Sequence, residues 1–262
     1  MPDLTTYGPW ALIVGGSEGV GAEFARQLAD EGFNLVLLAR KPGPLEETAE
    51  ECRRRGVEVR TLAVDLTSPD AVRLTVAATS GLDVGLLVYN AGANSYGHPF
   101  TAGELAGFQS VIDLNVTAML ALVHHHAQPM KQRGRGGILL VGSLARYVGA
   151  SHEAIYGAVK AFGRIFAEGL WIELQEHGVD VLELVLGVTR TPAMERAGLD
   201  FTIPGMHVSE PADVAREGLA HLGDGPVHVI TGNEAIVEMR GSSDRATLVT
   251  KTDARLKRLI GR

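Results

Sequence analysis

The sequence predicts an α/β protein in which seven parallel strands form a doubly wound sheet with helices on both faces. Short apolar runs alternate with longer helical patterns along most of the 262 residues, as in chains that build a parallel sheet through right-handed crossovers. The short runs are mostly or wholly apolar rather than alternating, which is typical of strands covered on both faces. No linker or internal repeat divides the chain, so we expect a single domain over residues 1–262.

Seven segments are the expected strands, each short and rich in aliphatic and β-branched side chains. In chain order they cover residues 10–15, 34–39, 57–64, 84–90, 137–142, 179–186 and 227–231. Six helical patterns connect them, and the last begins at a proline after Ser-Glu, a typical helix start. The expected helices cover residues 19–31, 44–55, 68–79, 102–133, 152–177 and 211–222.

The first expected strand runs into a glycine-rich turn of sequence Gly-Gly-Ser-Glu-Gly-Val-Gly, and a helix follows. Without Cβ atoms, such a turn lets a pyrophosphate reach the backbone N–H groups at the helix N-terminus. The turn therefore predicts a Rossmann-type nucleotide site. Its residues are Gly15, Ser17, Gly19, Val20 and Gly21. The spacing is G-x-x-x-G-x-G rather than the common dinucleotide fingerprint, so a plain tight connection is the alternative.

The same turn also satisfies G-x-S-x-G, the nucleophile elbow of α/β-hydrolases, with Ser17 as the nucleophile. That fold builds its oxyanion hole from a loop before the elbow, and only fourteen residues precede Gly15. A hydrolase would also leave Tyr156 and Lys160 without a role. It stays a remote alternative.

Tyr156, Lys160 and Ser143 form the principal candidate site. Tyr156 and Lys160 are spaced i and i+4, so on a helix they share one face. A nearby ammonium favours the phenolate, and we expect it to lower the pKa of Tyr156 from its ordinary value of about 10. Ser143 would hold a substrate oxygen while Tyr156 donates or accepts its proton. This is general acid–base chemistry on a carbonyl or an alcohol.

Together with Asn90-Ala91-Gly92 and with Asn115 in Leu-Asn-Val, these motifs resemble the short-chain dehydrogenase/reductase family in order and spacing over nearly the full length. The resemblance implies an NAD(P)-dependent oxidoreductase. It implies a catalytic tetrad of Asn115, Ser143, Tyr156 and Lys160, in which Asn115 holds a relay water and Lys160 also binds ribose hydroxyls. The opening Tyr7-Gly-Pro-Trp-Ala looks like the hydroxysteroid and 3-ketoacyl reductase branch.

The resemblance also implies further contacts to the cofactor, at Asp65, Leu66, Asn90, Val188 and Thr191. In the family, the residue matched by Asp65 contacts the adenine, and Val188 and Thr191 match positions that hold the nicotinamide carboxamide. Leu186 stands where the family usually carries a proline before Gly187, so we expect a less rigid loop there.

The end of the second expected strand indicates which nicotinamide cofactor is used. An acidic residue there would bind the ribose 2′-hydroxyl of NAD and repel a 2′-phosphate. The chain instead has Arg40 followed by Lys41, and a guanidinium can grip a phosphate. Glu18 lies where NADP-using relatives often carry a cation, and its carboxylate would repel a phosphate, which argues against NADP. We expect NADP, with NAD less favoured.

The expected substrate is a small hydrophobic ketone or secondary alcohol, steroid-like or acyl. The segment 192–208 lies where the family keeps its substrate lid and contains five large apolar residues, Met194, Leu199, Phe201, Ile203 and Met206. An apolar lid implies a hydrophobic substrate, although the same residues would also serve to pack the lid itself. A protein that binds NADP as a sensor, without turnover, is the other class kept open.

Composition argues against several other functions. The net charge of −7 and the pI near 5.7 speak against a nucleic-acid partner, which favours a basic surface. The single cysteine, Cys52, cannot form an internal disulfide, which fits a reducing cytoplasm. We expect no signal peptide and no membrane span, because the apolar runs are short. His124, His125 and His126 are consecutive, so a helix fans them apart and we expect no metal site.

The two long helices, 102–133 and 152–177, each carry large apolar residues around more than one face. Each can therefore serve both the sheet and a second subunit. Relatives use this pair to build a four-helix interface, and the last strand offers a second one at the sheet edge. We expect a homotetramer, or otherwise a homodimer.

Overall fold

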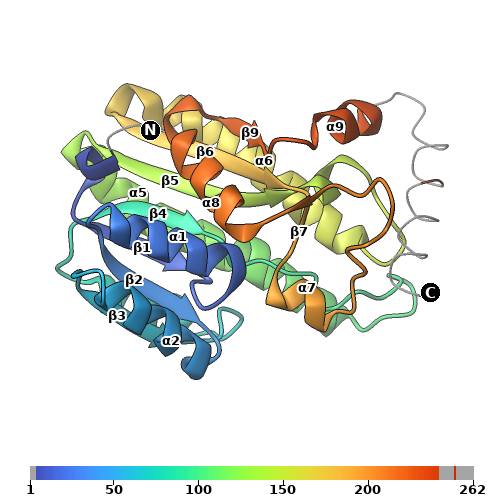
Figure 1. The fold of residues 1–262 in the computed structure, drawn as a ribbon, viewed down its shortest axis with the longest axis horizontal. Helices are drawn as coiled ribbons and strands as arrows, with labels where there is room; N and C mark the ends of the chain where they lie inside the picture. The colour runs from blue at the N-terminus through green and yellow to red at the C-terminus, as the bar shows by residue number, and fades with distance from the viewer. Residues whose placement is uncertain (1–3, 242–250, 252–262) are drawn as a thin grey trace.

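The computed structural model describes residues 4–241 and residue 251, so the ends of the predicted domain 1–262 lie outside the described residues. The described elements surround one seven-stranded sheet, with strand order β3-β2-β1-β4-β5-β6-β9 and every pairing parallel (Figure 1). This confirms the predicted doubly wound α/β fold.

The strands lie close to their predicted positions. They are β1 (Trp10–Val14), β2 (Asn34–Ala39), β3 (Val59–Ala63), β4 (Val84–Tyr89), β5 (Gly136–Ser143), β6 (Val179–Leu186) and β9 (Val227–Val229). The expectation of burial on both faces holds for the central strands and is wrong for β3. That strand forms the edge of the sheet, and its Arg60 and Thr61 are exposed.

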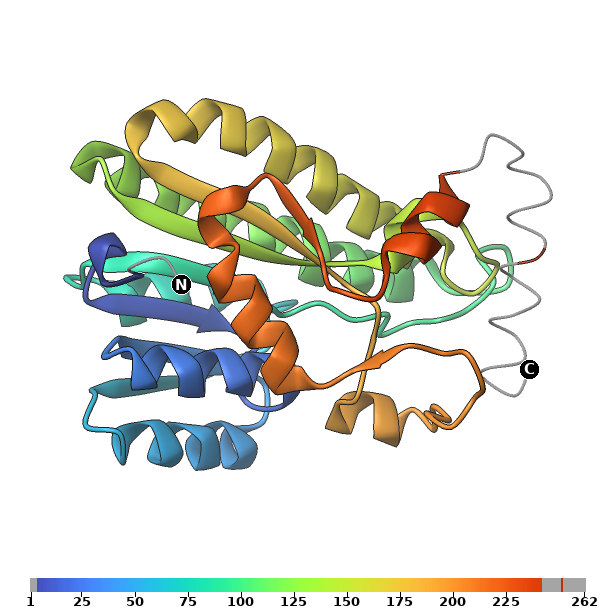
Figure 2. The ribbon, with the colours of Figure 1, turned by 45° about the horizontal axis from the view of Figure 1, so that its top comes forward.

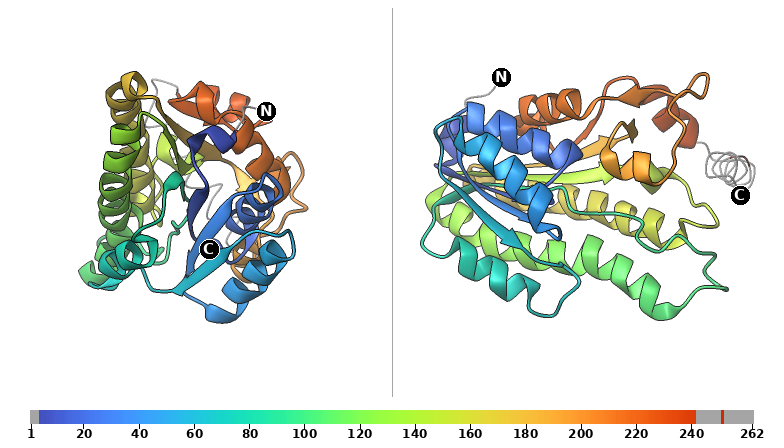
Figure 3. Two further views of the ribbon diagram at one scale, coloured as in Figure 1. Left: turned by 90° about the vertical axis from the view of Figure 1, so that its left-hand side faces the viewer. Right: turned by 60° about the horizontal axis from the view of Figure 1, so that its bottom comes forward.

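Helices cover the two faces of the sheet as two layers (Figure 3). One face carries α1 (Gly19–Asp30), α2 (Pro42–Arg53) and α8 (Pro211–Ala220), and the other carries α3 (Ala71–Thr79), α5 (Ala118–Arg133) and α6 (Ala154–Leu174). Successive strand residues belong to opposite cores: Ile13 and Leu37 pack under the first layer, and Leu12 and Leu38 under the second. Because both faces are core, the central strands β1 and β4 carry apolar side chains or glycine at every position.

The prediction of one continuous helix over residues 102–133 is wrong about where the helix begins and about its being unbroken. It begins at α4 (Leu105–Ile112), passes through one π-helical turn (η2, Asp113–Thr117), and continues as α5. The whole run from Leu105 to Arg133 is long and apolar enough to cross a membrane by length and composition. Its buried residues Met119, Leu122 and Val123 pack in the core of the sheet, as expected of a core helix.

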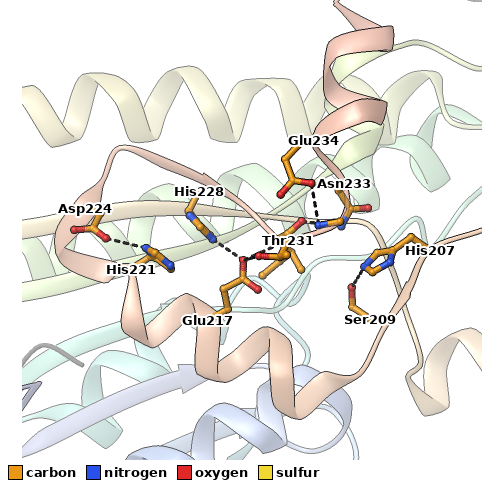
Figure 4. Close-up of polar contacts among 11 residues, drawn as sticks. His207, Ser209, Glu217, His221, Asp224, His228, Thr231, Asn233 and Glu234 are labelled. Carbon is orange, nitrogen blue, oxygen red and sulfur yellow. Dashed lines mark hydrogen bonds and ion pairs between the residues drawn. The ribbon is translucent and has the colours of Figure 1, made fainter.

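The other helices also differ from the prediction at their ends, and several short ones were not predicted. The latter are η1 (Leu4–Tyr7), η3 (Leu144–Tyr147), η4 (Gln175–His177), α7 (Pro192–Arg196), η5 (Leu222–Asp224) and α9 (Glu234–Arg240). Strand β9 ends before the predicted Thr231, because the Thr231 backbone N–H and hydroxyl turn to Glu217 of α8, at 2.8 and 2.9 Å. Glu217 also accepts a hydrogen bond from His228, so this carboxylate ties the last strand to α8 (Figure 4).

The predicted lid segment 192–208 is a loop that begins with α7 and lies beyond the carboxyl ends of the strands (Figure 2). Its two ends are joined by a short parallel ladder between β7 (Val188–Thr189) and β8 (Val208–Ser209). The ion pair between Arg190 and Glu210, at 2.9 Å, reinforces the same base. The loop is therefore fixed at its base and joined to the main sheet through β6.

Candidate active site

The four predicted catalytic residues meet at the carboxyl end of the sheet, although they come from three elements. Ser143 ends β5, Tyr156 and Lys160 lie one turn apart on α6, and Asn115 lies in the π turn η2. The side chain of Asn115 is buried, and its amide donates to the carbonyl of Val111 at 2.9 Å. The wider π turn therefore presents Asn115 inward, a use of π turns that recurs at functional sites.

Ser143 and Tyr156 are paired directly. The two hydroxyl side chains are hydrogen-bonded to one another. Ser143 also accepts a hydrogen bond from the backbone N–H of Ala145 at 3.1 Å, which caps η3 and fixes the serine rotamer. A substrate oxygen bound at this pair would lie within reach of both hydroxyl groups.

The expectation that Lys160 lowers the pKa of Tyr156 is wrong for this structure. Burial raises the pKa of Tyr156 to about 12, against a lowering contribution from the hydrogen bond with Ser143. The Lys160 ammonium lies 5.7 Å from the centre of the Tyr156 ring and donates to the carbonyl of Val141 at 2.9 Å. Burial also lowers the pKa of Lys160 to about 8, because both groups lose solvation of their charged forms.

Lys160 and Asn115 share a small polar space. A Cβ atom on Gly92 would lie 2.7 Å from Asn115 Oδ1 and 2.8 Å from Lys160 Nζ, so both groups face the same point. Asn115 Oδ1 is buried and has no hydrogen-bond partner within the described part of the chain. The adjoining cavity, lined by Ala91, Asn115, Lys160 and Glu183, offers about 10 Å³ to the centre of a water molecule. That is room for one water, and the unpaired oxygen gives it an acceptor.

The glycine turn forms a cradle that fits a dinucleotide. A Cβ on Gly21 would lie 1.9 Å from the carbonyl oxygen of Gly15, and one on Gly15 would lie 2.8 Å from the backbone nitrogen of Ala91. Gly15 and Gly19 have positive φ angles of 91° and 56°. No side chain caps the start of α1, so its first N–H groups remain available to a phosphate. Ser17 lies in this turn, and Val20 lies in the first turn of α1.

Asn90, directly after β4, supports the cradle, since its side-chain amide donates to the carbonyl of Gly15 at 2.9 Å. Asp65 and Leu66 follow β3, and Asp65 accepts from the backbone N–H and hydroxyl of Thr67 at 2.9 and 2.8 Å. These bonds, the backbone one first, hold the pKa of Asp65 below its usual value, and the Arg40 guanidinium adds to this. Arg40 is exposed, next to the predicted adenosine site.

Thr191 and Val188 lie at the other side of the cradle. The methyl group of Thr191 would be 3.0 Å from a Cβ on Gly19, and its hydroxyl caps α7 by accepting from Met194 N at 3.3 Å. The structure thus places the predicted nicotinamide loop directly against the predicted phosphate turn.

Asn233 is a supporting residue that the sequence analysis missed. Its side chain is buried, with Oδ1 2.1 Å from the position of a Cβ on Gly187 and Nδ2 donating to Ile230 at 2.9 Å. It lies at the start of α9, beside His207 of the lid (Figure 4). Asn233 therefore packs against the loop that follows Leu186. Leu186 itself stands at the position where the family usually carries proline. The Gly232-Asn233 turn was the only local feature in the sequence that could have indicated it.

A buried ion pair lies behind Ser143. Arg146 of η3 and Glu183 of β6 are in contact, with side chains 1% exposed on each. The pair ties the turn that starts at Ser143 to β6, the strand next to β5 in the sheet. Removing one partner from such a pair strands a buried charge, at a cost of about 3–5 kcal/mol.

Within residues 4–241, no group of three or more His, Cys, Asp or Glu side chains is arranged to hold a metal ion. Of the three consecutive histidines, His125 and His126 have ring centres 4.9 Å apart, and His124 points elsewhere. His126 is buried in the core side of α5, whereas His124 is exposed and contacts Gln128.

Comparison with known proteins gives the family. The model of the short chain dehydrogenase family matches residues 9–200. The chain is 31% identical over 218 residues to a 7beta-hydroxysteroid dehydrogenase of Clostridium sardiniense, covering 83% of each protein. It is 36% identical over 228 residues to a very-long-chain 3-oxoacyl-CoA reductase of Podospora anserina, covering 83% of this chain and 66% of that reductase.

Two solved structures extend the likeness to the fold. A structure described in work on 7beta-hydroxysteroid dehydrogenase stereoselectivity superposes with a TM-score of 0.86 at 28% identity over 99% of both chains. A short-chain dehydrogenase from Sphingobium yanoikuyae in complex with NADPH superposes with a TM-score of 0.78 at 30% identity over 96% of both chains.

Proposed function

The chain belongs to the short-chain dehydrogenase family, and from this premise we propose that it transfers a hydride between NADP(H) and a hydrophobic ketone or secondary alcohol. One observation carries the proposal: the Tyr156 hydroxyl is paired with Ser143, and Lys160 is buried one turn further along the same helix. That arrangement supports a role for Tyr156 as the proton donor and for Ser143 as the hydroxyl that binds the substrate oxygen.

Tyr156 is the proposed acid and Ser143 the group that orients the substrate oxygen. With its pKa raised to about 12, the Tyr156 phenol keeps its proton at neutral pH, which suits the reduction of a ketone. Ser143 is held by Ala145, so it offers its hydroxyl to the carbonyl oxygen without reorganising. When bound, the nicotinamide cofactor supplies the hydride.

Lys160 and Asn115 are proposed to keep the site supplied with protons. Lys160, with a pKa lowered to about 8 by burial, holds an exchangeable proton near neutral pH. A water in the adjoining cavity would be fixed by Asn115 Oδ1 and reach Lys160. The remaining ammonium donors would bind hydroxyl groups of the cofactor ribose.

NADP is the proposed cofactor in preference to NAD. The glycine cradle fits a pyrophosphate, and Arg40 and Lys41 are exposed cations where an acidic residue would select NAD. Neither forms an ion pair with another of the described residues, so both are available to a 2′-phosphate. The NADPH complex of a structural neighbour supports the same choice.

The proposed substrate is bulky and apolar, with a hydroxysteroid or its ketone first and a 3-oxoacyl thioester second. The relatives are named for these two substrate classes, and the match covers 83% of the hydroxysteroid dehydrogenase against 66% of the 3-oxoacyl-CoA reductase. Met194 on the lid and Phe100 in the loop after β4 are exposed apolar side chains. They offer contact to an apolar molecule held between these two loops.

The test is a panel of steroid ketones, 3-oxoacyl thioesters and a sugar ketone as polar control, each with NADPH and with NADH. We expect NADPH oxidation with an apolar ketone and none with the sugar. Tight NADP binding without turnover of any ketone or alcohol would favour the sensor alternative. Ester hydrolysis without cofactor, lost in Ser17→Ala, would favour the hydrolase.

We further propose a homo-oligomer in the cytoplasm, a tetramer first and a dimer second. Three large apolar side chains of α6, Phe162, Ile165 and Ile172, are exposed in the single chain, as is Leu105 on the neighbouring α4. Apolar residues exposed together on one surface favour a protein contact. A second copy that docks there through the same surface would bury them.

A further inference from the structure

The lid holds the glycine turn through one ion pair. Arg196, the last residue of α7, donates to both carboxylate oxygens of Glu18, with Nη1 to Oε2 at 3.0 Å and Nη2 in contact with Oε1. The two residues lie 178 positions apart in the chain. The two-pronged geometry is the one in which a guanidinium recognises a carboxylate most specifically. The lid base also touches the turn, through Thr191 at Gly19.

Glu18 is placed beside the cations that would bind a 2′-phosphate. It directly precedes α1, and Lys41 and Arg40 are near enough to stabilise its charge, after the larger effect of Arg196. The carboxylate is thus ionised and close to the proposed adenosine end of the cofactor. Left unpaired, it would repel a phosphate that Arg40 and Lys41 attract.

We propose that Arg196 is a positioning residue for cofactor choice: seated on the glycine turn, its guanidinium neutralises Glu18 and thereby permits binding of the 2′-phosphate of NADP. The inference rests on the proposed function, because it takes the cradle to be the nicotinamide dinucleotide site. It explains how a chain with an acidic residue at this position can favour NADP. It also makes the cofactor preference depend on a residue of the substrate lid.

If the ion pair only held the lid mechanically against the glycine turn, as a latch, its loss would have a different effect on cofactor binding, and an experiment can distinguish the two explanations. Both Arg196→Gln and Glu18→Gln break the ion pair, so a latch would make both variants weaker for NADP and for NAD alike. The two variants leave opposite charges behind. If the charge of Glu18 is what matters, they change NADP affinity in opposite directions and leave NAD affinity nearly unchanged.

The experiment is calorimetric titration of the full chain with NADP+ and with NAD+, for the wild type, both single variants and the double variant. We expect Arg196→Gln to weaken NADP+ binding by about three- to tenfold, and Glu18→Gln to strengthen it by about two- to fivefold, at low salt. In the Glu18→Gln background, Arg196→Gln should no longer change the ratio of the two affinities. Added salt should reduce both shifts. Arg216→Gln, which breaks the exposed pair with Asp213 on α8 and changes net charge equally, is the control.

Equal weakening of both cofactors in the two single variants would overturn the inference in favour of a latch. An unchanged ratio in Arg196→Gln, with the wild type binding NADP+, would overturn it while leaving the proposed function intact. A wild-type chain that binds neither dinucleotide would refute the proposed function itself, and the inference with it.

Discussion

Gly92→Ala tests the shared space between Lys160 and Asn115. The substituted Cβ would lie 2.7 Å from Asn115 Oδ1 and 2.8 Å from Lys160 Nζ, both too close for real contacts. Gly92 does not have a positive φ angle, so the backbone itself accepts alanine. The Asn115 amide donates to the carbonyls of Ala93 and Val111, at 3.2 and 2.9 Å, whereas among the described residues the Lys160 ammonium donates to the carbonyl of Val141 alone. The lysine is therefore the group that moves.

The size of the effect follows from that bond. To reach ordinary contact, Nζ must retreat from 2.8 to at least 3.4 Å, which misaligns or breaks the hydrogen bond to Val141. A hydrogen bond from a charged donor contributes about 1.5–3 kcal/mol. If that stabilisation is lost from the catalytic arrangement, kcat falls by about 10- to 100-fold. The cavity that admits one water also shrinks.

The assay is steady-state turnover with saturating NADPH, together with NADP+ affinity and the thermal midpoint of the same variant. Gly149→Ala is the matched control, because a Cβ there meets nothing within 4 Å and its φ is not positive. A Gly92→Ala enzyme whose kcat stays within about twofold of wild type would refute the placement of Lys160 and Asn115 in the reaction.

Arg40→Asp should shift the ratio of kcat/KM for NADPH over NADH towards NADH, because it removes a phosphate donor and offers a ribose acceptor; an unchanged ratio contradicts the role of Arg40. Burial lowers the pKa of His126 to about 4, whereas the unfolded chain binds the proton below about 6.5, so stability falls as pH drops from about 6.5 to 4. Urea unfolding at about pH 7 and about pH 5 should show a loss smaller by about 2 kcal/mol in His126→Leu than in wild type, and equal losses would contradict the burial. Light scattering should give four times the 27.8 kDa chain mass; twice that mass would leave one interface unused, and the chain mass itself would exclude assembly.

The central strands could be predicted from the sequence because burial on both faces favours an almost continuous run of apolar side chains. Where one face meets water the pattern is less informative, as at β3 with Arg60 and Thr61. The π turn at Asn115 was not predictable either. Its side chains continue a helical period, and the wider hydrogen bonding depends on how α4 and α5 pack together.

In the candidate site, the sequence predicted which residues lie near one another, but it did not predict how their side chains are oriented. Short motifs predicted that Ser143, Tyr156 and Lys160 form one site, and the structure places them near one another. The predicted lowering of the Tyr156 pKa was wrong because it depends on the fold. Burial raises this pKa, and the Lys160 ammonium donates to the carbonyl of Val141. The Arg146–Glu183 and Arg196–Glu18 pairs join distant parts of the chain, so no local spacing indicates them. The catalytic roles of Asn115, Ser143, Tyr156 and Lys160 stay predictions.

The most direct test of the central claim is reduction of the best ketone of the panel with NADPH dideuterated at its hydride-donating carbon. Mass spectrometry of the product and the kcat of Tyr156→Phe are read together. We predict one deuterium in the product alcohol, and a Tyr156→Phe variant that binds NADP+ normally but keeps less than about a tenth of wild-type kcat, a barrier increase above about 1.4 kcal/mol. A product without deuterium, or a Tyr156→Phe enzyme above that level, would contradict hydride transfer with Tyr156 as the acid.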